Sequence, residues 1–323
     1  MTPLDSLPRT EGPGAWLLLP LAGVSIAAPL HIGKAFITNL TFTEWLLVER
    51  RMFTDEYEAL VANGYTFAPY ALFPVPFEVN AEDAYEALAT DRQALSISLR
   101  LAGLRGFVEP ELLCIYFRAG AGTRRPDAGT NVRWPGPYRQ AMYERHFAVV
   151  ELDAGIAART EELLPTVYRW LEITGPFDRT CLNLLRQSHV PFVRANDRLL
   201  FLFAAVEALL YSWHERIEGA SLMRRAELVM SIAGEPQSSK SLLERIRKVR
   251  NELAHGEIND DKYAGLVAPL QRVVGVLVTV WLRFCVAVTP PPGNTRRELF
   301  NARLAESLRT GEPVEQARRR LFG

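Results

Sequence analysis

The sequence predicts an α+β protein in which a β-rich amino-terminal domain is followed by an all-helical bundle. Short apolar runs separated by Gly and Pro fill residues 1–155, as expected for a series of short strands. Apolar residues then recur at helical spacing through residues 156–290, beginning with a connecting helix. Consecutive prolines at 290–292 separate this bundle from residues 291–323, which we expect to form a basic helical tail.

The predicted strands of the first domain are short and lie between turn residues. They are residues 16–21, 35–40, 45–50, 95–101, 112–118 and 147–152. In the fourth, Ser96, Ser98 and Arg100 alternate with apolar residues, which indicates a strand with one solvent-exposed face. Residues 120–138 have no such period, so we expect a long loop there. It is either a solvated hairpin tip or, through its arginines beside Trp134, a surface for RNA.

The helical half contains segments with a period of about 3.6 residues. They are residues 156–173, 178–187, 196–218, 221–233, 241–255 and about 260–288. Ser221 is expected to cap the start of the fourth helix, and Gly234 lies just past its end. Gly256 is expected to stop the fifth.

Several features favour a cytoplasmic protein without a membrane span. The most apolar stretches, residues 199–211 and 273–288, contain Glu207 and Arg283, so we expect buried bundle helices. The apolar run at residues 14–30 lacks the basic segment that precedes the core of a secretory signal. Three widely spaced cysteines form neither a disulfide framework nor a zinc site, which fits a reducing compartment.

Net charge gives no bias toward nucleic acid, because 37 Lys and Arg balance 37 Asp and Glu. Any nucleic-acid surface must therefore be local. The tail is one candidate, since residues 291–323 hold seven arginines against four glutamates. It is an amphipathic helix, a phosphate-binding arm or, as such charge more commonly indicates, a solvated helical tail.

The most informative string is RKVRNELAHG, residues 247–256, at the end of a predicted helix. On an ideal helix, Arg250 and His255 would point about 140° apart, whereas Asn251 and His255 lie within about 40°. Because Gly256 can end the helix, the His255 side chain can reach past that end toward Arg250. We therefore expect a cluster of Arg, Asn and His.

Such a cluster fits cleavage of RNA by its own 2′-hydroxyl group. A base removes the hydroxyl proton, an acid protonates the leaving 5′-oxygen and a cation holds the phosphate. His255 can serve either proton step, Arg250 can clamp the phosphate and Asn251 can orient the substrate. The chemistry needs no metal and no other cofactor. One histidine cannot be acid and base in the same step, so we expect a two-fold homodimer. The alternative is a histidine that only caps helix carbonyl groups.

Glu207 is a charged residue inside an apolar helix, and a buried carboxylate needs a partner. Arg225, on the flank of the next helix, or Arg250 could neutralise it. Glu207 would then give the site electrostatic support. A purely structural ion pair is the alternative.

This order of segments resembles the HEPN superfamily, particularly its ApeA-like branch. The resemblance covers residues 176–290 and rests on AVEALL at 205–210, the short helix with Arg225, and VRNELAHG at 249–256. It implies a helical bundle that dimerises and acts as a metal-independent endoribonuclease in bacterial toxin, abortive-infection or antiphage systems.

The resemblance also assigns roles. The family's Arg-x4-6-His motif falls on Arg250 and His255, its common asparagine on Asn251 and its acidic helix residue on Glu207. Residues 1–155 would be a sensing or regulatory domain that responds to a phage-derived trigger or an antitoxin-like partner, and RNA would be the substrate. The alternatives are a non-catalytic dimerisation or interaction module and a nucleotide-binding regulator.

Overall fold

The described part of the chain forms two compact units, residues 1–168 and 169–323. The computed structural model describes residues 14–21, 24–39, 69–104, 115–119, 150–189, 193–211, 219–235, 244–245, 248–249, 251–252 and 263–323. Strands occur in the first unit and the second is helical, so the α+β class is confirmed. The boundary between the two units, at residues 168 and 169, falls inside helix α6 (Ala154–Ile173). The predicted boundary at residue 155 falls in the first turn of the same helix.

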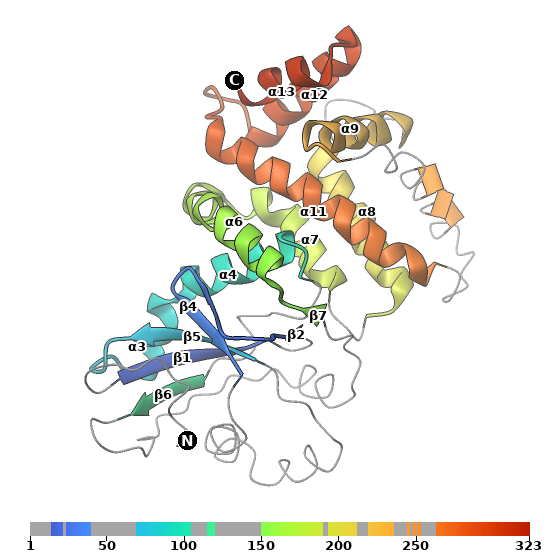
Figure 1. Ribbon diagram of the computed structural model, residues 1–323. Helices are drawn as coiled ribbons and strands as arrows, with labels where there is room; N and C mark the ends of the chain where they lie inside the picture. The colour runs from blue at the N-terminus through green and yellow to red at the C-terminus, as the bar shows by residue number, and fades with distance from the viewer. Residues whose placement is uncertain are drawn as a thin grey trace. The chain divides into compact units, whose positions relative to one another are not determined.

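The first unit contains a five-stranded antiparallel sheet with the strand order β3-β4-β5-β1-β6 (Figure 1). Its strands are β1 (Gly14–Pro20), β3 (Leu30–Ile32), β4 (Ala35–Thr38), β5 (Tyr70–Val75) and β6 (Ile115–Ala119). Leu17 of β1 lies opposite Phe73 of β5 and Tyr116 of β6. Separately, β2 (Val24–Ser25) pairs in parallel with β7 (Val150–Glu151).

The predicted strands at 16–21 and 35–40 are confirmed as β1 and β4. Those at 112–118 and 147–152 overlap β6 and the two-residue β7, whereas 45–50 lies outside the described residues. Strand β5 was not predicted, because YALFPV is apolar on both faces and contains a proline. It nevertheless pairs with both β1 and β4.

The predicted strand at 95–101 is wrong, because these residues form the second half of helix α4 (Ala89–Leu101). The polar members of the alternation, Ser96, Ser98 and Arg100, are all buried, as are the apolar residues between them. A helix that is buried on every side has no solvent-exposed face, so the positions of its polar residues do not follow the helical period. Alternation of polar and apolar residues in such a helix therefore does not indicate a strand. The shorter α3 (Ala81–Ala87) precedes it and is capped by the side chain of Asn80.

A buried carboxylate ties three elements of the first unit together. Asp91 of α4 accepts a 2.5 Å hydrogen bond from the Tyr168 hydroxyl of α6 and forms a 3.1 Å ion pair with Lys34 in the β3–β4 turn. In the same turn, the backbone N–H of Gly33 donates to the Glu161 carboxylate of α6. Burial, together with the bond to Asp91, raises the pKa of Tyr168 well above its usual value. The phenol therefore remains a donor throughout the physiological pH range.

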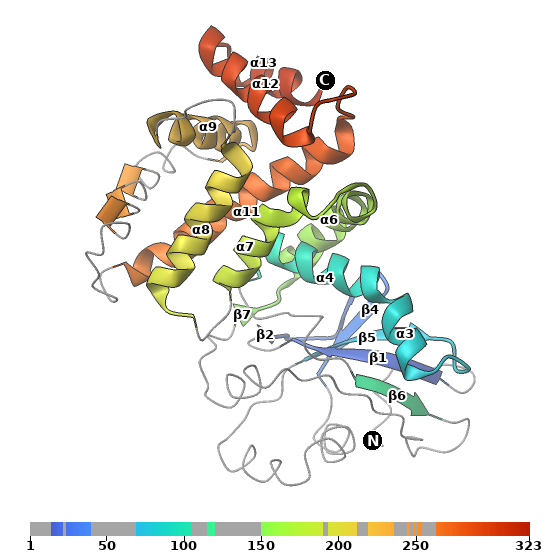
Figure 2. The ribbon, with the colours of Figure 1, turned by 180° about the vertical axis from the view of Figure 1, so that it is seen from behind.

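The second unit consists of helices packed around α11 (Ala264–Ala287). The others are a short 3-10 turn (Phe177–Arg179), α7 (Thr180–Ser188), α8 (Ala195–Leu210), α9 (Gly219–Ile232), α12 (Arg296–Thr310) and α13 (Val314–Phe322). Helix α11 lies along α8 in both views (Figures 1 and 2) and also contacts α7 and α9. The bundle core therefore forms around α11.

Most of the predicted helices are confirmed, with different ends. Helix α8 ends at Leu210, and residues 212–218 of the predicted third helix lie outside the described part. Helix α9 begins at Gly219, so Ser221 lies inside it and is not its cap, while Gly234 takes the expected left-handed conformation (φ 79°) after its end. The last bundle helix starts at Ala264 and not near 260. Only parts of the predicted helix 241–255 are described.

Helix α11 is long and apolar enough to cross a membrane, judged by length and composition alone. More than half of its most apolar stretch is nevertheless buried inside the protein. Trp281 on this helix donates its indole N–H to the backbone carbonyl of Asp178 at 3.1 Å. Core helices of soluble proteins pass the same test, and this burial is that of a core helix.

The carboxy-terminal helices belong to the packed bundle. Helices α12 and α13 both contact α9, and Phe300 of α12 packs its ring edge-on against Trp281 and Phe284 of α11. Leu304 and Leu321 are fully buried. The helical prediction for residues 291–323 is confirmed. The solvated tail is wrong, because these apolar side chains complete the core as those of an amphipathic helix do, and the phosphate-binding arm stays a prediction.

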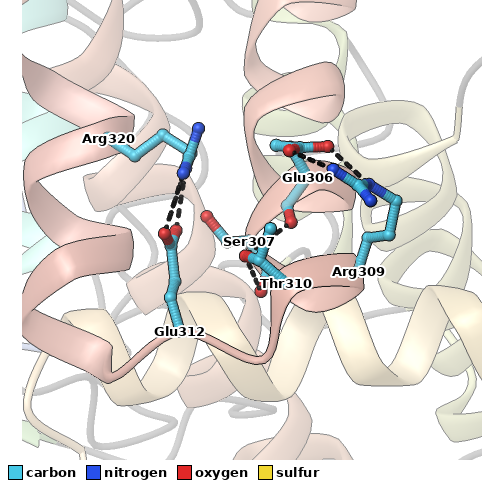
Figure 3. A network of polar contacts seen from close by, with 6 residues as sticks. All are labelled: Glu306, Ser307, Arg309, Thr310, Glu312 and Arg320. Atoms are coloured by element: carbon cyan, nitrogen blue, oxygen red, sulfur yellow. Dashed lines mark hydrogen bonds and ion pairs between the residues drawn. The ribbon is translucent and has the colours of Figure 1, made fainter.

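The turn between α12 and α13 is held by ion pairs (Figure 3). Arg309 pairs with Glu306 at 2.6 Å within α12, and Arg320 of α13 pairs with Glu312 in the turn at 2.9 Å. Gly311 takes the left-handed conformation (φ 61°) that ends α12. Of these contacts, the Arg320–Glu312 pair joins α13 to the turn.

The buried carboxy-terminal helix gives the first prediction. Leu321→Ala should lower the free energy of unfolding by about 3 kcal/mol, because it leaves a cavity under α13. Val314→Ala on the same helix is the control, since Val314 is 40% exposed and its truncation should cost less than about 1 kcal/mol. Urea unfolding followed by circular dichroism measures both. Equal, small effects would show that α13 does not contribute to the core.

Candidate functional site

Glu207 lies in the last turn of α8 and its side chain is half-buried. Its neighbours on the inner side of the helix, Phe203, Val206 and Leu210, are buried. The carboxylate is therefore at the carboxyl end of an apolar helix, where the helix dipole is negative. Negative charge at this place is locally unfavourable unless cations compensate it.

The structure brings two arginines and an asparagine to this end of α8. Arg297 donates to the carbonyl of Ala208 at 3.2 Å, Asn301 to that of Leu209 at 3.0 Å and Arg225 to that of Leu210 at 3.2 Å. The preceding carbonyl, that of Glu207 itself, accepts from the backbone N–H of Tyr211. All four final carbonyl groups of the helix are thus satisfied, three of them by side chains from α9 and α12.

Arg225 and Asn301 are also bonded to each other, at 3.0 Å, and both are almost completely buried. The sequence predicted that Arg225 or Arg250 neutralises Glu207, which stays a prediction. What the structure adds is a place for Arg225 at the end of the helix that carries Glu207. Sequence reasoning missed Asn301 and Arg297. The sequence did contain one signal for them: Phe300 and Leu304 are spaced as on one side of a helix, which indicates that this side, with the neighbouring Asn301, is buried.

The string RKVRNELAHG, residues 247–256, is described only in part. Asn251 is helical and exposed, and Glu252 next to it is half-buried. Val249 is buried, which identifies the inner side of this helical segment. Arg250 and His255 lie outside the described residues. The structure therefore places two of the four predicted site residues, Glu207 and Asn251, and the predicted Arg250–His255 cluster stays a prediction.

A pocket of about 380 Å³ adjoins the capped end of α8. Its wall is mostly apolar and includes Leu209, Trp281 and Cys181. Its charged edge is the ion pair between Asp178 and Arg296, at 3.7 Å. Among the described residues, no three His, Cys, Asp or Glu side chains come close enough to hold a metal ion.

No protein-family model matches the sequence, and no curated protein or solved structure matches it either.

The capped helix end gives a second prediction. Asn301→Ala should lower the free energy of unfolding by about 3 kcal/mol, because it leaves the Leu209 carbonyl and one Arg225 N–H buried without their partner. The same substitution at exposed Asn294 is the control and should have little effect. Chemical denaturation of the purified variants tests this. If both variants are as stable as the parent, the cap does not hold the bundle together.

The buried thiols give a third prediction. Burial raises the pKa of Cys181 to about 12 and moves that of Cys285 above its usual range. A raised pKa means less thiolate at any given pH, so neither thiol should react with iodoacetamide at pH 8 in the folded protein. Both should react in denaturant, and peptide mass spectrometry resolves each site. Rapid labelling of Cys181 in the folded protein would contradict the burial.

Proposed function

We propose that the chain is a metal-independent endoribonuclease of the HEPN type that acts in the cytoplasm of a bacterium, in defence or as a toxin. The observation that carries the proposal is the order of its polar residues on consecutive helical segments. Glu207 lies in the last turn of α8, Arg225 lies on α9, and the VRNELAHG string follows before α11, all within the second unit. Arg225 also donates to the Leu210 carbonyl at the end of the helix that carries Glu207, which supports a cation at this end of the helix.

The proposed reaction is transfer of the phosphoryl ester within the RNA. The 2′-oxygen attacks the adjacent phosphorus as one histidine accepts its proton, and the bond from phosphorus to the 5′-oxygen breaks. A second histidine donates a proton to that leaving oxygen. The products are a 2′,3′-cyclic phosphate and a 5′-hydroxyl. Arg250 holds the phosphate oxygens, and Asn251 orients either the substrate or the imidazole.

Two histidines are needed at one scissile bond, so the active species is a homodimer in which each subunit contributes His255. Glu207 supports the site through its charge. Residues 1–155 hold the activity in check or direct it in response to a phage-derived trigger or an antitoxin-like partner. The rival functions, a non-catalytic interaction module and a nucleotide-binding regulator, would leave RNA intact.

Cleavage of total cellular RNA in EDTA is the test, and it is the fourth prediction. Purified parent protein should release fragments with 5′-hydroxyl and 2′,3′-cyclic phosphate ends. His255→Ala should reduce the rate by about 100-fold or more and Arg250→Ala by a similar factor, because each removes a group that acts in the transition state. Thermal unfolding and size-exclusion chromatography must show that both variants are folded and have the parent's oligomeric state.

His31→Ala is the matched control, since His31 is an exposed histidine of the first unit and should leave the rate unchanged. If the parent leaves RNA intact, even with extract of phage-infected cells added as a trigger, catalysis is excluded and the interaction module becomes the better hypothesis. Cleavage that survives His255→Ala would assign the activity to other residues or to a contaminant.

A further inference from the structure

The pocket beside the capped end of α8 has the size and the lining of a site for a small molecule. Its volume of about 380 Å³ is at the small end of the range of about 300–1,000 Å³ that ligand pockets occupy. Leu209, Trp281 and Cys181 in its wall are almost completely buried. Because burial raises the pKa of the Cys181 thiol to about 12, this side chain is neutral. The wall therefore suits an apolar group.

One edge of this pocket holds an ion pair whose members are unusually far apart. The carboxylate of Asp178 and the guanidinium of Arg296 are separated by 3.7 Å, whereas Arg309 and Glu306 of the same bundle are at 2.6 Å. Both side chains of the wide pair are about one-fifth exposed, at 20% and 22%. Within the described part of the chain, neither charged group forms a hydrogen bond, and the Nε of Arg296 is buried without a partner. Both groups thus have unused hydrogen-bonding capacity at the edge of the pocket.

The other charges around the pocket are already engaged and balance each other. Arg297 also lines the pocket, but it donates to a backbone carbonyl of α8 at 3.2 Å. The Glu298 carboxylate accepts from the backbone N–H of Thr295 at 2.8 Å and closes the start of α12. Since Arg297 and Glu298 have opposite charges, as do Asp178 and Arg296, these four side chains are neutral together. A matching ligand therefore has one positive and one negative group and no net charge.

We propose that this pocket binds a free α-amino acid with an apolar side chain. Its carboxylate would accept hydrogen bonds from Arg296, its ammonium group would donate to Asp178, and its side chain would lie against the apolar wall. An α-amino acid carries both charged groups on one carbon atom, so it can bridge two side chains that lie only 3.7 Å apart. A simple carboxylate would match only Arg296, and an amine would match only Asp178.

This site goes beyond the proposed ribonuclease function and does not depend on it. None of the residues that line the pocket belongs to the string at 247–256, and all of them are described and lie within the second unit. Binding can therefore be measured whether or not the protein cleaves RNA. Cleavage without amino-acid binding would remove only this site, and binding without cleavage would remove only the nuclease assignment.

The test is isothermal titration calorimetry of the whole protein with four free amino acids, L-valine, L-leucine, L-methionine and L-phenylalanine. At least one should bind with a stoichiometry of one per chain. Glycine should bind about 10-fold more weakly or worse, because it has no apolar side chain to bury. The tightest ligand is then compared with the same molecule lacking its ammonium group and with the same molecule lacking its carboxylate. Each should lose about 10-fold or more in affinity, since hydrogen bonds between charged groups are removed.

Two variants locate the site on the protein. Arg296→Gln and Asp178→Asn should each weaken binding of the tightest amino acid by about 10-fold or more, because each leaves one of its charged groups without a charged partner. Arg309→Gln is the matched control, since it removes an arginine and an ion pair from the same helix, α12, outside the pocket. Its affinity should equal that of the parent. Thermal unfolding shows whether each variant is folded.

Several results would overturn the amino-acid site. It is wrong if none of the four amino acids binds, or if the acid or the amine binds as tightly as the amino acid that contains both groups. It is also wrong if Arg296→Gln and Asp178→Asn bind as the parent does, or if Arg309→Gln loses as much affinity as they do. The comparison of amino acid, acid and amine uses only the parent protein, so the site can be refuted even if a variant does not fold.

Discussion

The carboxyl end of α8 is the constraint on which the rest of the helical unit depends. A helix end leaves its last carbonyl groups without intrahelical partners, and burial of such groups without a hydrogen bond costs a few kcal/mol each. Here the helix end lies among packed helices, so side chains, and not water, donate the hydrogen bonds to these carbonyl groups. Asn301 reaches the Leu209 carbonyl from 92 residues further along the chain. The carboxy-terminal helices are therefore required to complete α8, which explains why their apolar side chains are buried with it.

The same contacts bear on the electrostatics of Glu207. A carboxylate in the last turn of a helix opposes the helix dipole, and cations at that end are favourable. Two of the three side chains that cap α8, those of Arg225 and Arg297, are cations. They offset the negative helix end. If one of them also neutralises the Glu207 carboxylate, as the sequence predicts for Arg225, a residue that opposes a local preference is compensated by distant segments, which is the pattern expected of a functional site.

The sequence predicted long periodic helices well and buried polar contacts poorly. Helices α6, α8 and α11 were found because each has a sustained apolar stripe. The strand expected at 95–101 failed because seven alternating residues do not distinguish a strand from a helix that is buried on all sides. Asn301 could not be identified as a cap, since its partners lie on α8 and α9 and only the tertiary fold brings them together. For the candidate site, the string at residues 247–256 was identified from the sequence, and the side chains that cap the end of α8 were identified only from the structure.

Local charge alone does not identify a nucleic-acid surface, as residues 244–252 and the carboxy-terminal helices α12 and α13 demonstrate. Helices α12 and α13 have more arginines than residues 244–252, yet many of these arginines bind carbonyl groups or carboxylates of the same bundle. A cation that already has an internal partner must give up that partner before it can bind phosphate, so its net contribution to RNA affinity is small. Among the described residues of 244–252, Arg245 and Lys248 lie beside the carboxylates of Glu244 and Glu252, so this segment has no net positive charge there either. The exposure of a cation and the carboxylates around it, rather than the count of basic residues, therefore decide whether a segment can attract RNA.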